Sequence, residues 1–191
     1  MANIIRRQFT YNLDGNKSRC IFDRPHMCIV GEDNKEVYQI IINQLTEKNT
    51  PDDLVFVSLL EDERDLSIPF IYSESMNINE IGHLIDERIS YLIENNVRSL
   101  KDYISKCTTF LPFPCVFILV DDNSVSSIRG LITEAASVGI FFVYFTNQEE
   151  ALNMDRKLLS KFHDLILVRR GMDNNLEVQF VNYQFRLFVK R

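Results

Sequence analysis

A glycine and a lysine follow a short apolar segment near the start of the chain, at a spacing that could bind phosphate. Residues 26–30 are predicted to form a buried strand, Gly31 begins a turn, and Lys35 lies where a helix is expected to begin. Backbone N–H groups at such a helix start can bind a phosphate group. Glu32 and Asp33 place negative charge in the same turn, which opposes an anion there. Asp33 or Asn34 is expected to cap the helix instead.

Two adjacent carboxylates follow a second apolar segment. Asp121 and Asp122 come directly after residues 115–120, a continuous apolar run. Parallel sheets place their ligands at the carboxyl ends of strands, so Asp121 could hold the water shell of a Mg²⁺ ion. The plainer alternative, which the sequence favours, is that the two aspartates end a strand and begin a turn.

Other catalytic and metal-binding patterns are missing from the sequence. Three histidines, His26, His83 and His163, are far apart and lack metal-ligand spacing. Four cysteines form no CxxC pair and are expected to act as small buried apolar side chains in a reducing cytoplasm. We therefore predict no metal site and a cytoplasmic protein.

Charge is distributed unevenly along the chain, whose net charge is −6. Residues 1–25 carry five basic and two acidic side chains, residues 156–191 eight and three, and the middle eight and 22. Basic and aromatic residues interleave in the last ten positions, a pattern that can stack on single-stranded nucleic acid. The possible nucleic-acid contacts are Arg169, Arg170, Arg186, Lys190 and Arg191. An amphipathic edge strand with a solvated charged face explains the same pattern more simply.

Apolar periodicity predicts alternating strands and helices. Strands are expected at 8–13, 19–22, 26–30, 54–60, 68–72, 115–120, 140–145, 165–168, 177–183 and 185–189, and helices at 35–48, 78–95, 99–106, 124–138 and 152–162. The first two strands flank Asp14-Gly15 and predict a β-hairpin. Fully apolar strands favour an α/β fold with a mostly parallel sheet and helices on both faces.

The chain has 191 residues, which suits one domain. We divide it into an N-terminal hairpin (1–25), a core (26–170) and terminal strands (171–191). No apolar run approaches the roughly 18 residues that span a bilayer, and the first residues lack the apolar region of a secretory signal. We therefore expect no membrane insertion.

Several segments resemble, in the same order, motifs of the FtsK/SpoIIIE family of DNA-translocase motor domains. Residues 25–31, PHMCIVG, resemble the family's "PHLLVAG" strand, and residues 48–56, KNTPDDLVF, resemble "KNTPEDVRF". The other resembling segments are 13–17, 96–103, 115–122, 135–140 and 145–148. The resemblance implies a RecA-like fold that binds ATP and Mg²⁺. It also implies that Asp121 and Asp122 match the Walker B pair, and that Asn147 or Gln148 matches a sensor glutamine.

Departures from the family's phosphate-binding loop decide the predicted activity. The working motif is GxxxxGK[ST], whose glycines, lysine and hydroxyl bind the phosphates and Mg²⁺. The segment from Gly31 to Lys35 is two residues shorter, the second glycine is missing, and Glu36 stands where the hydroxyl belongs. Asp122 is one methylene shorter than a catalytic glutamate and would position water poorly. We expect no catalytic residue, no cofactor, and a remnant of a nucleotide site at Gly31, Lys35, Asp121, Asp122 and Asn147.

These features favour a non-catalytic subunit or adaptor of a DNA-transfer, segregation or secretion machine. The resemblance implies that it packs against an active relative, or against itself, through the surface that the family uses for ring assembly. Two alternatives remain open. One is an active ATP-dependent DNA translocase with an aberrant loop, which would need ATP and Mg²⁺. The other is a DNA-binding protein that uses only the RecA-like scaffold.

Overall fold

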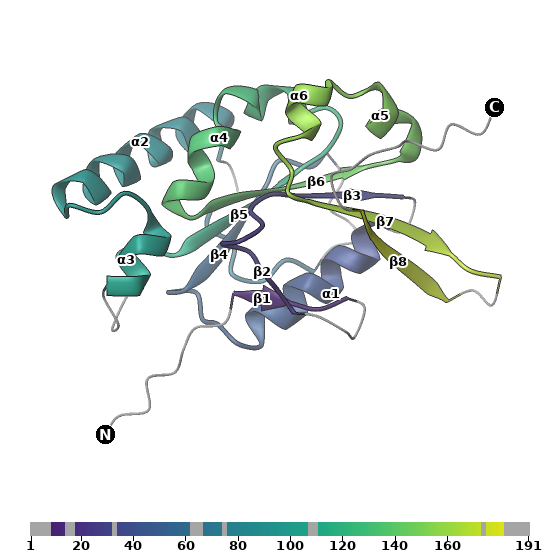
Figure 1. Ribbon diagram of the computed structural model, residues 1–191, viewed down its shortest axis with the longest axis horizontal. Helices are drawn as coiled ribbons and strands as arrows, with labels where there is room; N and C mark the ends of the chain where they lie inside the picture. The colour runs from purple at the N-terminus through teal and green to yellow at the C-terminus, as the bar shows by residue number, and fades with distance from the viewer. Residues whose placement is uncertain are drawn as a thin grey trace.

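A six-stranded sheet forms the centre of the computed structural model, which describes residues 9–13, 18–31, 34–61, 67–73, 76–106, 111–172 and 175–181 (Figure 1). The strand order is β4-β5-β6-β3-β7-β8. The strands are β3 (Met27–Val30), β4 (Leu54–Ser58), β5 (Cys115–Val120), β6 (Ile140–Thr146), β7 (Asp164–Arg170) and β8 (Leu176–Val181). The first five strands in this order are parallel, and β8 runs antiparallel to β7. The predicted α/β class and mostly parallel sheet are therefore confirmed.

The central strands are buried on both faces because helices and a hairpin cover the sheet from both sides. Every residue of β3, β5 and β6 is buried. Alternate side chains enter two apolar clusters: Cys28, Val116 and Tyr144 belong to one, and Ile29, Phe117 and Phe145 to the other. Burial on both faces explains why these strands are continuous apolar runs in the sequence.

Helix α1 and the N-terminal hairpin cover one face, and α2, η1, α4, η2, α5 and α6 cover the other (Figure 1). The helical elements are α1 (Asn34–Thr46), α2 (Ile78–Glu94), α3 (Leu100–Lys106), η1 (Val125–Gly130), α4 (Ile132–Ala135), η2 (Ala136–Val138), α5 (Gln148–Asn153) and α6 (Arg156–Leu159). Helix α3 contributes Leu100 to the cluster on the α1 side. No helix in the described ranges is long and apolar enough to cross a membrane.

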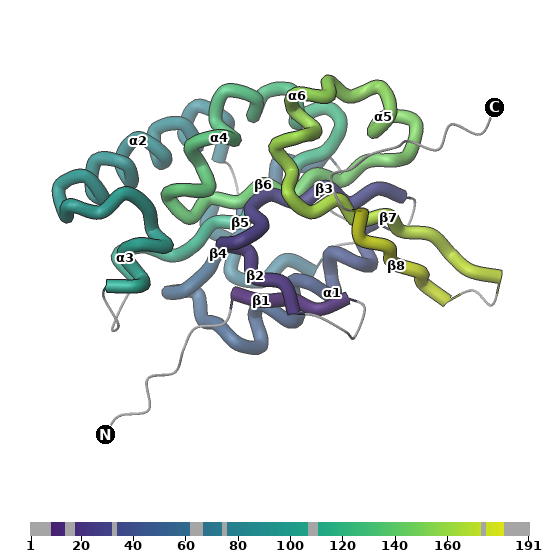
Figure 2. The backbone as a smooth tube through the Cα atoms, in the orientation of Figure 1, coloured from purple at the N-terminus to yellow at the C-terminus, as the bar shows by residue number. Residues whose placement is uncertain are grey.

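The predicted hairpin consists of β1 (Thr10–Tyr11) and β2 (Arg19–Cys20), which pair antiparallel and lie beside α1 (Figure 2). The amide of Gln44 on α1 exchanges two hydrogen bonds of 2.7 Å with the backbone of Asn12. The hairpin is also fixed to the start of β7 at the buried carboxylate of Asp164. The hydroxyl of Tyr11 and the guanidinium groups of Arg19 and Arg24 all donate to Asp164.

Two predicted helices are wrong in extent because local hydrogen bonds interrupt them. The segment predicted as one helix at 124–138 forms η1, α4 and η2. The Ser124 hydroxyl accepts a hydrogen bond from the N–H of Asp121, and the Ser127 hydroxyl donates to the Ser124 carbonyl. Such side-chain hydrogen bonds compete with regular α-helical geometry. The segment 152–162 is split between α5 and α6, because Met154 is extended and Asp155 caps α6 by accepting from the N–H of Lys157.

The predicted strand at 68–72 is reduced to one bridge between Phe56 and Ile71. Pro69 lacks a backbone N–H, so it cannot contribute to a ladder. Gly139 ends η2 in the left-handed conformation at φ 76°. The segment 185–189 lies outside the described residues.

Candidate functional site

Gly31, the first residue after β3, lies against the backbone of β7. Its N–H donates to the carbonyl of Thr146 at 2.9 Å, and its φ is 145°. A Cβ atom at this position would lie 2.2 Å from the carbonyl oxygen of Val168. Packing alone therefore requires glycine here, whether or not a phosphate binds.

The connection between β3 and α1 is short. β3 ends at Val30 and α1 begins at Asn34, so residues 31–33 alone join them. The working phosphate loop has four residues between its two glycines, which this connection cannot supply. The amide of Asn34 donates to the Thr146 carbonyl at 3.2 Å, which fixes the start of α1 against β6. Lys35 lies in the first turn of α1 and is half-buried.

A cavity of about 880 Å³ opens at the carboxyl edge of the sheet, beside this turn. Its lining residues are Gly31, Asn147, Gln148, Glu149, Val168, Arg169 and Arg170. The structure thus brings together two residues that the sequence assigned to a nucleotide remnant and two that it assigned to nucleic-acid contact. Lys35, Asp121 and Asp122 do not line this cavity.

Both arginines of this cavity have an acidic partner. Arg169 pairs with Glu177 at 2.6 Å, and Arg170 pairs with Glu36, in the first turn of α1, at 2.7 Å. The Arg169 side chain is 77% exposed, so solvent screens its pair strongly. An anionic ligand can therefore compete with these glutamates for the two arginines at the rim of the cavity. The other predicted contacts, Arg186, Lys190 and Arg191, lie outside the described residues.

Asp121 uses both carboxylate oxygens to shape the turn after β5. One oxygen accepts from Ser124 and Asn123, at distances of 2.9 to 3.1 Å, and the other accepts from the N–H of Glu61 at 3.0 Å. Partial burial would raise the pKa of Asp121, but these hydrogen bonds outweigh it and hold the pKa below its usual value. The geometry matches the plainer interpretation of Asp121, a residue that begins a turn.

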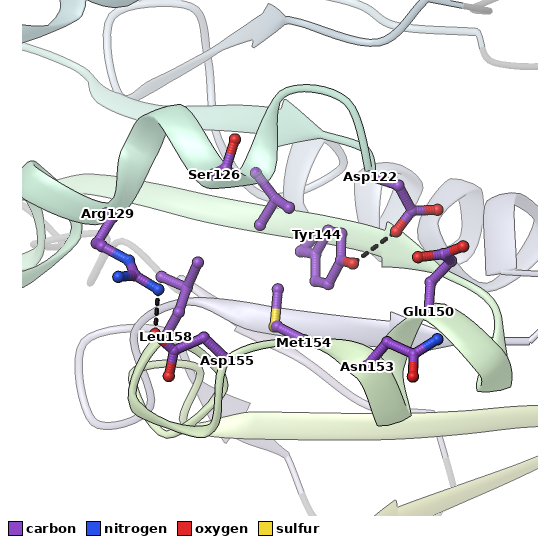
Figure 3. A pocket seen from close by; sticks show the side chains of 10 residues that line it. Asp122, Ser126, Arg129, Tyr144, Glu150, Asn153, Met154, Asp155 and Leu158 are labelled. Atoms are coloured by element: carbon purple, nitrogen blue, oxygen red, sulfur yellow. Dashed lines mark hydrogen bonds and ion pairs between the residues drawn. The ribbon is translucent and has the colours of Figure 1, made fainter.

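Asp122 points toward the other face of the sheet. Its Oδ1 accepts from the hydroxyl of Tyr144 at 2.6 Å and from Thr146 at 2.8 Å. Figure 3 shows its carboxylate at the rim of a second cavity of about 490 Å³. The lining residues are Asp122, Val125, Ser126, Arg129, Tyr144, Glu150, Asn153, Met154, Asp155 and Leu158.

Asn147 caps α5. Its side-chain oxygen accepts from the N–H of Glu150 at 2.9 Å, and its φ and ψ are extended, as expected for an N-cap. This role accounts for an asparagine at the end of β6 without a nucleotide.

Sequence reasoning singled out Asp122 but did not predict the second cavity, which this residue lines. Its lining comes from η1, from β6 and from α5 and α6, which are separated in the sequence and meet only in the fold. The available signals were Asp122 and Tyr144, a hydroxyl within a mostly apolar strand.

The histidines do not form a metal site. Within the described ranges no three His, Cys, Asp or Glu side chains cluster as metal ligands. His26 is buried, and its Nδ1 accepts from the N–H of Phe142 at 3.0 Å. Burial lowers its pKa to about 3, so the ring is neutral. His83 is exposed on α2.

No protein-family model and no curated protein matches this chain. Solved structures do. EssC (ATPases 2 and 3) from Geobacillus thermodenitrificans aligns with a TM-score of 0.63 and 12% identity, over 79% of this chain and 33% of EssC. The cytoplasmic domain of the type VII secretion ATPase EccC from Thermomonospora curvata aligns with a TM-score of 0.58 and 17% identity, over 77% and 20%. The pCW3 conjugation coupling protein TcpA with ATPγS aligns with a TM-score of 0.62 and 12% identity, over 84% and 53%.

The chain therefore spans between a fifth and about half of the length of these structures. At such identities the likeness concerns the fold. It agrees with the parallel strand order, with the hairpin before β3 and with the helices on both faces. The chain has the RecA-like α/β fold that these secretion and conjugation ATPases contain.

Proposed function

We propose that this chain is a non-catalytic, RecA-like subunit or adaptor of a secretion or DNA-transfer machine. The fold likeness to secretion and conjugation ATPases and the ordered motif resemblance to the FtsK/SpoIIIE family support the kind of machine. The short connection between Val30 and Asn34 is the observation that carries the non-catalytic role. A cytoplasmic location is part of the same proposal.

ATP with Mg²⁺ does not fit the residues at the expected site. The connection is too short for a loop that surrounds phosphates, and Glu36 in the first turn of α1 adds a negative charge there. Both oxygens of Asp121 already accept hydrogen bonds from the β5–η1 turn and Glu61, and Asp122 is bonded to β6 on the other face. The positive dipole of α1 returns only about 0.3–1 kcal/mol to a bound anion.

A protein partner, or a second copy, is the proposed ligand of the RecA-like surface. DNA binding by Arg169 and Arg170 would first break their ion pairs with Glu177 and Glu36. These exposed pairs are weak, so the DNA-binding alternative is tested directly by salt dependence. A scaffold that binds DNA through these arginines would lose affinity steeply with salt.

Steady-state ATP hydrolysis, with and without double-stranded DNA, tests the non-catalytic role. We expect no turnover above the rate of a buffer blank. Hydrolysis that DNA stimulates and that Lys35→Ala or Asp121→Ala abolishes would overturn the proposal and restore the translocase. Lys48→Ala is the matched control, because Lys48 is an exposed lysine beyond the other end of α1.

The adaptor role requires an assembly. Multi-angle light scattering of the purified chain is expected to show either a self-assembled species or, on mixing with a RecA-like ATPase subunit from the same machine, a complex of defined mass. A monomer that forms neither across a micromolar concentration range contradicts this part of the proposal.

A further inference from the structure

The cavity beside Asp122 is a groove on the face opposite α1, bounded by η1 on one side and by α5 and α6 on the other (Figure 3). It is separate from the cavity at Gly31 and shares no lining residue with it. Its floor is the ring of Tyr144, and Val125, Met154 and Leu158 add apolar wall. A volume of about 490 Å³ is in the range of pockets that bind a few side chains.

The charges of the groove are unbalanced at one end. Arg129 forms an ion pair with Asp155, so this cation is neutralised within the groove. At the other end the carboxylates of Asp122 and Glu150 lie near one another (Figure 3). Within the described part of the chain the Glu150 carboxylate accepts no hydrogen bond and forms no ion pair, and Asp122 is bonded only to uncharged hydroxyl groups. A ligand that complements the groove therefore has apolar side chains and at least one cation.

Residues 182–191 of this chain have that chemistry. Their sequence, NYQFRLFVKR, contains three basic and no acidic side chains, together with three aromatic rings. This is the most basic and aromatic stretch available to the groove without a second molecule.

Residues 182–191 follow β8, whose last residue contacts the apolar cluster on the groove's side of the sheet. Val181, the last residue of β8, pairs with Leu165 at the start of β7. Its side chain packs against the apolar cluster that contains Tyr144 and Leu158, two residues of the groove. Val181 is level with Tyr144 across β7 and β3, three strand spacings away, which is about 14 Å. Ten residues reach at most about 33–36 Å when extended, which exceeds this separation.

We propose that the groove binds residues 182–191 of the same chain. The aromatic side chains of the segment contact Tyr144 and the apolar wall, and one of Arg186, Lys190 and Arg191 neutralises Asp122 and Glu150. These cations are then withheld from nucleic acid. This inference does not depend on the absence of ATP binding.

Hydrogen exchange of the full chain, read by mass spectrometry on peptides from 182–191, tests the proposal. In the unmodified protein we expect at least tenfold slower exchange than in the free peptide of the same sequence. Glu150→Lys reverses the unpartnered charge and is expected to remove this protection. Glu149→Lys is the matched control, because Glu149 is its exposed neighbour on α5 and lines the other cavity.

Reversing the charges of both the groove and residues 182–191 tests whether the two contact each other. Adding Arg186→Glu, Lys190→Glu and Arg191→Glu to Glu150→Lys is expected to return most of the protection. Glu150→Gln removes the charge without reversing it and should give an intermediate loss, which keeps the test valid if Glu150→Lys does not fold. Exchange at the rate of the free peptide in the unmodified protein, or equal effects of Glu149→Lys and Glu150→Lys, would overturn the proposal. Protection that disappears on dilution would overturn the intramolecular arrangement, because the ligand would then belong to a second copy.

Discussion

The two ends of β7 carry charge in opposite ways. At its start, Asp164 is 1% exposed and accepts from Tyr11, Arg19 and Arg24. At its end, Arg169 and Arg170 are exposed to solvent, and each pairs with a glutamate. Buried, multiply bonded charge is costly to disturb, whereas exposed pairs exchange readily with a ligand. The comparison indicates that the amino edge of the sheet anchors the hairpin, and that the carboxyl edge is available for binding.

The largest expected effect is at the amino edge. Asp164→Ala removes the buried carboxylate that Tyr11, partly buried Arg19 and Arg24 share, and we expect unfolding free energy to fall by about 3–5 kcal/mol. Chemical denaturation monitored by circular dichroism measures this loss. Asp23→Ala is the control, because Asp23 pairs with Lys101 on the surface and should leave the midpoint nearly unchanged. Equal effects of the two substitutions would remove the distinction between the edges.

Gly31→Ala tests the close approach at the carboxyl edge. The new Cβ would lie 2.2 Å from the Val168 carbonyl oxygen, at a φ that L-residues rarely adopt. We expect a loss of about 3 kcal/mol in thermal or chemical unfolding. Gly130→Ala is the matched control, since a Cβ there meets nothing within 4 Å. A Gly31→Ala protein as stable as the Gly130→Ala protein would show that β3 and β7 are not held this closely.

His26 predicts acid sensitivity at the amino edge. Its folded pKa is about 3, and an unfolded histidine titrates near 6.5, so the unfolded state binds the proton first. The stability that neutral His26 supplies is complete above about pH 6.5 and is lost as pH falls toward 3, with a slope of up to about 1.4 kcal/mol per pH unit. His26→Asn keeps a hydrogen-bond acceptor and tolerates the positive φ, so it should flatten this slope. An unchanged slope in His26→Asn would contradict the assignment.

The smallest expected effect on stability is at the end of β7. Arg170→Ala removes an ion pair whose side chains are 40% and 51% exposed, and we expect the unfolding free energy to change by at most about 1 kcal/mol. A loss of several kcal/mol would show that the Arg170–Glu36 pair anchors the fold as Asp164 does. The carboxyl edge would then not be available for binding.

The sequence predicted the sheet well because its central strands are apolar on both faces. Residues 115–120 were placed without error. The broken helices were missed because their causes are local bonds of Ser124, Ser127 and Asp155, which periodicity does not register. Gly31 was singled out as part of a nucleotide remnant, whereas its packing reason, the carbonyl of Val168, lies 137 residues away in the chain and becomes visible only in the fold.

The candidate site was harder to predict for the same reason. Asp121 and Asp122 are adjacent in sequence, but the first shapes a turn and the second belongs to a groove on the face away from α1. Conversely, Asn147 and Arg170 were assigned to different functions and line one cavity. The strand order, with β3 between β6 and β7, decides which side chains share a cavity. No single sequence motif encodes that order.

Equilibrium binding of ATP with Mg²⁺ by isothermal calorimetry, with and without DNA, tests the central claim most directly. The proposal that the three-residue connection and Glu36 exclude a triphosphate predicts no measurable heat at millimolar nucleotide. Micromolar binding that is lost in Asp121→Ala and retained in Lys48→Ala would contradict the account. The segment 31–35 would then rearrange around phosphate, and the chain would have to be treated as an active translocase.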